Sequence, residues 1–227
     1  MVTEMGFVVV YFFLHQLRGE QFMKNYELQL PEGYVEAKTI DAKTDTKIMV
    51  VFSVVSALVA VGAVVVAWLC LGLTSNNWID KLIGDGSNLW HNFAFMGAMV
   101  AYIILHELTH GIVYKVMTKQ KLTFGLTLTV AYCGVPNIYV YRKTALCALL
   151  APFLVFLPIF TALPFFMKEP IDILWCALLW GMHVGGCVGD LYCTILYLFK
   201  FRDPRTLLRD TGPKQTFYIP TEQNLQA

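Results

Sequence analysis

Four long apolar runs dominate this 227-residue sequence and leave little of it for a water-soluble core. The hydrocarbon layer of a bilayer is about 30 Å thick, which an α-helix crosses in about 20 residues. The runs are long enough to do so, and they cover residues 48–73, 93–117, 144–166 and 173–199. Apolar residues make up 57% of the chain and charged residues only 15%, which excludes a disordered chain and an ordinary soluble domain. The sequence therefore predicts four transmembrane helices.

Prolines set the third run apart from the other three. Pro152, Pro158 and Pro164 lie within residues 144–166. A proline inside a helix has no N–H to donate and clashes with the preceding turn. We therefore expect this helix to be kinked or broken.

The positions of the basic residues predict the orientation of the helices. All but Lys81 and Lys168 of the 17 Lys and Arg residues lie before the first run, around the connection between the second and third, or after the fourth. Loops rich in Lys and Arg stay in the cytoplasm. Both termini are thus predicted to be cytoplasmic in a multi-pass protein of the cell membrane. The 16 acidic residues nearly cancel the basic ones, so no nucleic-acid partner is expected.

The predicted fold class is an all-α polytopic membrane protein with four transmembrane helices. We divide the chain into a cytoplasmic lead-in (residues 1–47), a four-span membrane domain (48–200) and a cytoplasmic tail (201–227). Within the lead-in, residues 5–14 are apolar but too short to span, so a short interfacial helix or a poorly ordered tail is expected.

The second run contains a pattern that is typical of a metal site. Charged groups are costly inside a bilayer, so the few that occur there point to function. The run includes His106-Glu107-Leu108-Thr109-His110, an H-E-x-x-H pattern. Two histidines four residues apart lie on one helical face and can bind one Zn²⁺, and the Glu beside the first can hold a water. We predict His106 and His110 as metal ligands and Glu107 as the catalytic base.

The third ligand is predicted by elimination. A catalytic zinc uses three protein ligands and keeps one position open. In the other three runs, Asp190 is the only carboxylate well inside apolar sequence. His183 and Cys187 lie on the same predicted helical face as Asp190, so either is an alternative third ligand. If His183 is not a ligand, we expect it to support a ligand or to face the substrate.

The sequence of the second cytoplasmic connection, between the second and third runs, has two interpretations, of which the first is a β-hairpin. Residues 122–129 alternate between apolar and Thr positions, Cys133-Gly134 is a turn candidate, and residues 138–141 are suited to a returning strand. Such a hairpin would bind an extended substrate by strand addition, with Thr127 and Ile138 as candidate substrate-binding positions. The alternative is a connector that dips into the membrane.

Together these motifs resemble a known group of enzymes. The H-E-x-x-H pattern in one span and Gly-Asp at residues 189–190 two spans later are similar to the site-2 protease class of intramembrane zinc metalloproteases. The chain resembles more closely the zincin peptidase family of small bacterial membrane proteins, over about residues 25–200. Leu-Pro-Glu-Gly-Tyr at residues 30–34 and Ala-Pro-Phe at 151–153 add to this resemblance.

The resemblance implies a zinc-dependent endopeptidase that works in or at the edge of the membrane, near its cytoplasmic side. Its substrate would be a peptide or a transmembrane segment, and its other partner the lipid bilayer. The sequence does not predict an oligomeric state. A metal-binding protein without proteolytic activity, such as an ion transporter or an inactive regulatory relative, is the alternative function.

Overall fold

The computed structural model describes residues 24–71, 88–126 and 131–221. The apolar stretch at residues 5–14 therefore lies outside the described part of the chain. Within that part, four helical segments are long and apolar enough to cross a membrane, and they match the four predicted runs. They are α2 (Thr46–Cys70), α4 (Asn88–Thr118), α5 (Arg142–Ala162) with the short 3-10 helix η1 (Leu163–Phe166), and α6 (Pro170–Gly186) with its continuation.

Two of the spans change their helix type along their length. Helix α5 continues through both Pro152 and Pro158, and the third span changes to the 3-10 helix η1 where Pro164 occurs. The fourth span is interrupted, because α6 ends at Gly186 and α7 (Val188–Ile195) begins after Cys187. The short π-helix η2 (Leu196–Lys200) completes this span. The interruption places Asp190 in the first turn of α7.

The prediction of an all-α fold is wrong, because the described residues also form seven strands. Five of them make an antiparallel sheet in the order β1-β5-β6-β7-β2. These strands are β1 (Tyr26–Glu27), β5 (Tyr139–Tyr141), β6 (Leu207–Asp210), β7 (Lys214–Pro220) and β2 (Tyr34–Asp41). The segments predicted as a lead-in and a tail thus pair with each other, and the fold is a mixture of helices and sheet.

A separate two-stranded sheet lies in the connection between α4 and α5. Strand β3 (Thr123–Leu126) pairs antiparallel with β4 (Ala131–Gly134). The predicted turn at Cys133-Gly134 is wrong, because both residues belong to β4. The predicted returning strand, β5, pairs with β1 and β6 of the larger sheet instead.

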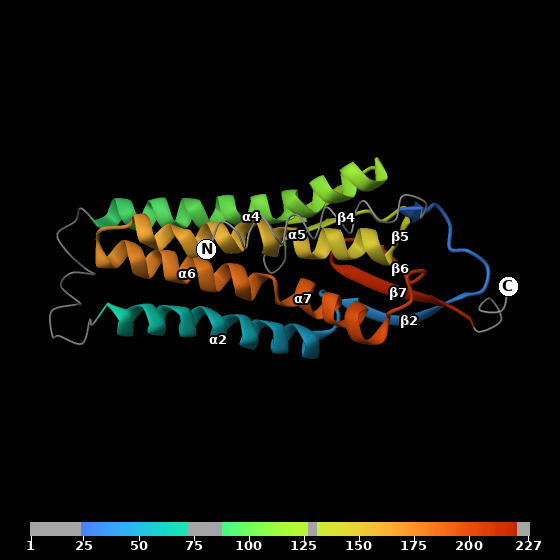
Figure 1. Cartoon of the computed structure of the whole chain (residues 1–227), viewed down its shortest axis with the longest axis horizontal. Coiled ribbons are helices and arrows are strands. Elements are labelled where there is room, and N and C mark those ends of the chain that lie inside the picture. The colour runs from blue at the N-terminus through green and yellow to red at the C-terminus, as the bar shows by residue number, and fades with distance from the viewer. Residues whose placement is uncertain (1–23, 72–87, 127–130, 222–227) are drawn as a thin grey trace.

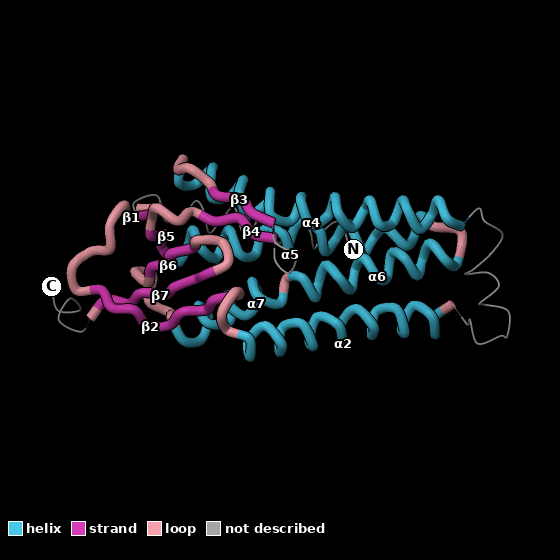
Figure 2. The backbone as a smooth tube through the Cα atoms, turned by 180° about the vertical axis from the view of Figure 1, so that it is seen from behind, coloured by secondary structure: helices cyan, strands magenta, loops and turns pink. Residues whose placement is uncertain are grey.

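The larger sheet covers one end of the helical bundle (Figures 1 and 2). The start of α2, the end of α4, the start of α5 and the end of η2 all lie at this end, which is the arrangement that alternating spans produce. Buried side chains join the sheet to the helices. Phe217 and Leu208 of the sheet pack in one cluster with Tyr114 of α4, Ala148 of α5 and Tyr197 of η2. The sheet is therefore held against the part of the bundle that contains the predicted metal ligands.

Small residues bring α2 and α6 into close contact. The Ser56 hydroxyl of α2 donates to the Gly185 carbonyl of α6 at 2.6 Å. One turn away, a Cβ atom added to Gly181 would lie only 2.6 Å from the Cα atom of Ala60. Small residues at such contacts let membrane helices approach closely.

We predict that Gly181→Ala destabilises the protein by about 1–3 kcal/mol, the usual cost of overpacking, because α2 must move away from α6. Gly62→Ala is the matched control, since a Cβ there meets nothing within 4 Å. It should be neutral or stabilising, by up to about 1 kcal/mol from helix preference. Thermal unfolding of both variants in detergent measures the difference, and equal midpoints would contradict the packing described.

Candidate metal centre

Three side chains from two helices converge on one point. His106 and His110 lie one turn apart on α4, and Asp190 faces them from α7. The Nε2 atoms of the two histidines are 3.2 Å apart, and each is 3.4 Å from Oδ2 of Asp190. Both imidazoles are buried. The structure therefore brings together the three residues predicted as metal ligands.

The size of this triangle suits zinc. Zn²⁺ binds nitrogen and oxygen at about 2.0–2.2 Å in tetrahedral geometry, which places neighbouring ligand atoms about 3.3–3.5 Å apart. The three observed separations of 3.2, 3.4 and 3.4 Å agree with that spacing. The spacing of these side chains thus fits a metal ion.

The other imidazole nitrogens have partners inside the protein. His110 Nδ1 lies 2.8 Å from the Ala148 carbonyl oxygen, and His106 Nδ1 lies 3.1 Å from the Tyr102 hydroxyl. A carbonyl only accepts, so a neutral His110 must carry its proton on Nδ1, and its Nε2 then presents a lone pair. If a neutral His106 donates its Nδ1 proton to the Tyr102 hydroxyl, its Nε2 also presents a lone pair. Two lone pairs and a carboxylate then face one another, and a cation between them relieves this repulsion.

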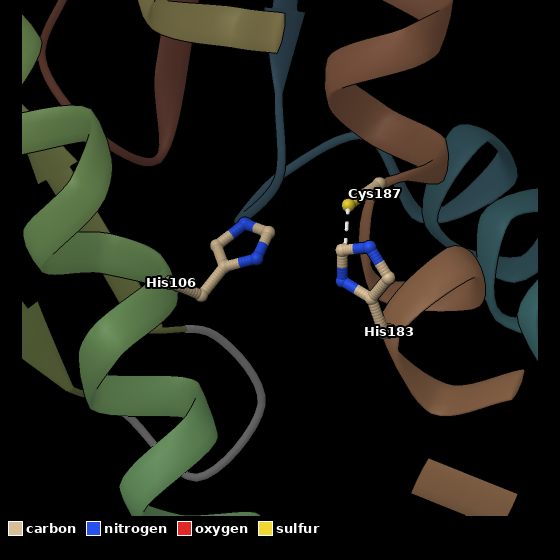
Figure 3. A group of neighbouring side chains, drawn as sticks. All are labelled: His106, His183 and Cys187. Carbon is tan, nitrogen blue, oxygen red and sulfur yellow. Dashed lines mark hydrogen bonds between the residues drawn. The ribbon is translucent and has the colours of Figure 1, made fainter. Parts of the chain in front are cut away.

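A second group of metal-binding residue types shares His106 (Figure 3). His183 and Cys187 face His106 from the C-terminal end of α6, and the ligand atoms of the three lie within 4.8 Å of one another. However, the Tyr102 hydroxyl joins the two histidines, at 2.8 Å from His183 Nδ1, while Cys187 Sγ is 3.8 Å from the same nitrogen. The shorter and more regular triangle favours Asp190 over His183 and Cys187 as the third ligand. His183 then supports His106 through Tyr102.

Glu107 lies beside this triangle in a cavity of about 480 Å³. The carboxylate is half-buried and accepts a hydrogen bond from the backbone N–H of Cys133 in β4. Helices α2, α4 and α7, strand β4 and the β6–β7 turn all contribute to the cavity wall, with Phe52, Ser56, Tyr102, Tyr132, Asp190 and Gly212 among its residues. The cavity leaves room for water and a small ligand next to Glu107.

Asp210 of β6 is a buried acid in the same cavity wall that sequence reasoning missed. Its carboxylate accepts hydrogen bonds from the Tyr114 hydroxyl at 2.7 Å and from the Gly212 N–H at 2.8 Å. Gly212 has φ +94, a conformation that favours glycine, so the turn depends on this residue. Burial raises the pKa of Asp210 to about 6 despite these two donors. In the sequence Asp210 is one acid of a charged tail, with nothing to mark it as buried.

Neither of the two candidate substrate-binding positions is seen in the cavity wall. Thr127 lies outside the described residues. Ile138 is 1% exposed and packs in the core beneath the sheet, so its side chain does not face the cavity.

Comparison with known proteins gives a match to a family model. Residues 99–204 match a family model described as "Putative zincin peptidase". This match supports a zincin-like family. The matched segment runs from α4 to just past η2 and contains His106, Glu107, His110 and Asp190. Zincins are zinc enzymes, so zinc is the metal that the family implies. No curated protein and no solved structure matches the chain.

Proposed function

We propose that this protein is a membrane-embedded zinc endopeptidase that cleaves peptide bonds near the cytoplasmic side of the bilayer. The observation that carries the proposal is the triangle of His106, His110 and Asp190, with edges of 3.2–3.4 Å, beside Glu107 in a cavity. Metallopeptidases of the H-E-x-x-H type need this combination of two imidazoles, a third ligand and a carboxylate that does not bind the metal.

Each residue has a distinct task in this proposal. His106, His110 and Asp190 would hold Zn²⁺, which when bound acidifies water and polarises a carbonyl. Glu107 accepts a proton from the attacking water on its carboxylate and passes it to the nitrogen of the leaving amine. The Cys133 N–H holds the Glu107 carboxylate in the cavity. Tyr102 and the Ala148 carbonyl orient the two imidazoles.

The position of the site in the helices supports a location within the membrane. His106 lies 12 residues before the end of α4 at Thr118 and Asp190 lies ten before the end of η2 at Lys200. At 1.5 Å per residue these offsets put the site about 15–18 Å from the helix ends at the sheet, which is within a bilayer core about 30 Å thick and on the side of the sheet. The sheet and most of the basic residues mark the nearer end, which the positive-inside rule assigns to the cytoplasm. The substrate is then a transmembrane segment or a peptide that enters from that side.

Metal removal tests the proposal. The purified protein should contain about one zinc per chain, as the single triangle allows. A strong chelator should abolish cleavage of reporters, and added Zn²⁺ should restore it. Two reporters are used, a soluble peptide and a transmembrane segment in liposomes, so that the result also locates the substrate. Zinc content without cleavage of either reporter would favour the non-proteolytic alternative.

A further inference from the structure

We infer that Pro152 is a positioning residue for the metal centre, because it leaves the Ala148 carbonyl free to orient the His110 imidazole. This inference rests on the proposed function, in which His110 is a zinc ligand. Pro152 has no contact with the metal triangle in this role and acts through the backbone of α5. Metal binding then depends on a residue of the third span as well as on the three ligands.

The first step is the geometry of the α5 backbone. In an α-helix each carbonyl accepts the N–H of the residue four positions later. The residue four positions after Ala148 is Pro152, which has no N–H to donate. Helix α5 nevertheless continues from Arg142 to Ala162 without interruption. The carbonyl of Ala148 is consequently left without its helical partner at a buried position of α5.

The second step is the partner that replaces it. His110 Nδ1 of α4 lies 2.8 Å from the Ala148 oxygen, and both Ala148 and His110 are buried. An unpaired carbonyl in an apolar environment is costly, and a transmembrane proline is tolerated where a neighbouring helix supplies the missing donor. His110 is that donor. Because the bond fixes the proton on Nδ1, Nε2 is left free and points at His106 and Asp190.

The third step is the consequence for metal binding. Partners of the nitrogen opposite the metal orient a histidine ligand, and their removal usually costs about 10–100-fold in metal affinity. An N–H at position 152 would compete for the same carbonyl and draw it back along the helix axis. The His110 imidazole would lose its fixed orientation although none of the three ligand residues is changed.

The test compares zinc affinity and metal-free stability in three variants of the full-length protein. Pro152→Ala and Pro152→Gly both supply the competing N–H, and both should lower Zn²⁺ affinity by about 10–100-fold, measured by competition with a chromogenic chelator. Pro152→Ala should leave the metal-free protein folded, because the Ala148 carbonyl exchanges one hydrogen-bond donor for another, and circular dichroism and the thermal midpoint of the metal-free protein measure this. Pro158→Ala is the control for the same chemical change elsewhere in α5, six residues further along at an exposed position, and it should leave zinc affinity unaltered.

The outcomes separate this inference from the proposed function. Wild-type protein that binds no zinc would overturn the proposed function itself. Wild-type protein that binds zinc, with equal affinity in the Pro152 variants, would overturn only the role of Pro152. Loss of affinity in Pro152→Gly but not in Pro152→Ala, or equal loss in Pro158→Ala, would assign the effect to packing or helix stability rather than to the missing N–H. Loss of the folded state in the metal-free Pro152 variants would assign the lower affinity to misfolding and would also contradict the inference.

Discussion

Replacing Glu107 by Gln is expected to lower cleavage of a reporter by about 100- to 10,000-fold while zinc stays bound, the range usual for loss of a general acid–base group. Gln has nearly the same shape, and its amide oxygen can still accept the Cys133 N–H that Glu107 accepts. It has no basic oxygen to take a proton from water. Because Glu107 is not a member of the metal triangle, the ligands are left intact.

Zinc content by mass spectrometry and reporter cleavage, measured on the same preparation, give the two readouts for Glu107→Gln. Glu169→Gln is the control, because it makes the same chemical change at the start of α6, at the opposite end of that helix from His183. It should retain both zinc and activity. Cleavage that survives in Glu107→Gln would remove Glu107 from the mechanism.

Asp190→Asn is expected to lower zinc affinity by more than about 100-fold, beyond what loss of a supporting residue usually costs. The change removes the negative charge that lies 3.4 Å from both His106 and His110. It preserves the size of the side chain, so a loss of binding reflects the ligand and not the packing of α7. Cleavage should fall to the same extent as zinc occupancy.

Two variants of the alternative ligands on the same span are compared with Asp190→Asn. Cys187→Ser should keep zinc affinity, because Sγ lies next to His183 and not in the metal triangle. His183→Asn should lose about 10–100-fold, since it removes the partner of Tyr102. Equal zinc affinity in wild type and Asp190→Asn, with a large loss in Cys187→Ser, would make Cys187 the third ligand.

The parts of the structure that the sequence predicts are those with local signals. The four runs could be located because a helix that crosses a bilayer must be apolar over about 20 residues. The histidines could be placed on one face because residues four apart always share it. Asp190 was found because a carboxylate is rare in such a run, and the structure places it opposite the histidines.

The sheet had no such signal. Strands β2 and β7 pair Val35 with Ile219 and Thr39 with Thr216, so each strand finds its partner more than 170 residues away. Both strands carry charged residues and lie in segments that hydropathy alone marks only as water-exposed ends. Pairing over such distances depends on where the four helices bring the chain ends, which periodicity within one segment does not reveal.

The residues that orient the ligands could not be predicted from local sequence patterns either. Tyr102 is one of 11 tyrosines and occupies an apolar face, and Ala148 contributes only its backbone oxygen. Pro152 was noticed as a signal for a kinked or broken helix. Helix α5 continues through it, and the Ala148 carbonyl meets His110 of α4 instead of an N–H of its own helix, which becomes visible only when α4 is seen to lie against α5.

Zinc K-edge X-ray absorption of the Glu107→Gln protein tests the metal centre most directly, because it reports the ligands of the bound ion. The predicted spectrum contains two imidazole nitrogens and at least one oxygen at about 2.0–2.2 Å, with no sulfur neighbour. This result corresponds to His106, His110 and Asp190 as the protein ligands. A protein that retains no zinc, or a sulfur shell at about 2.3 Å from Cys187, would contradict it.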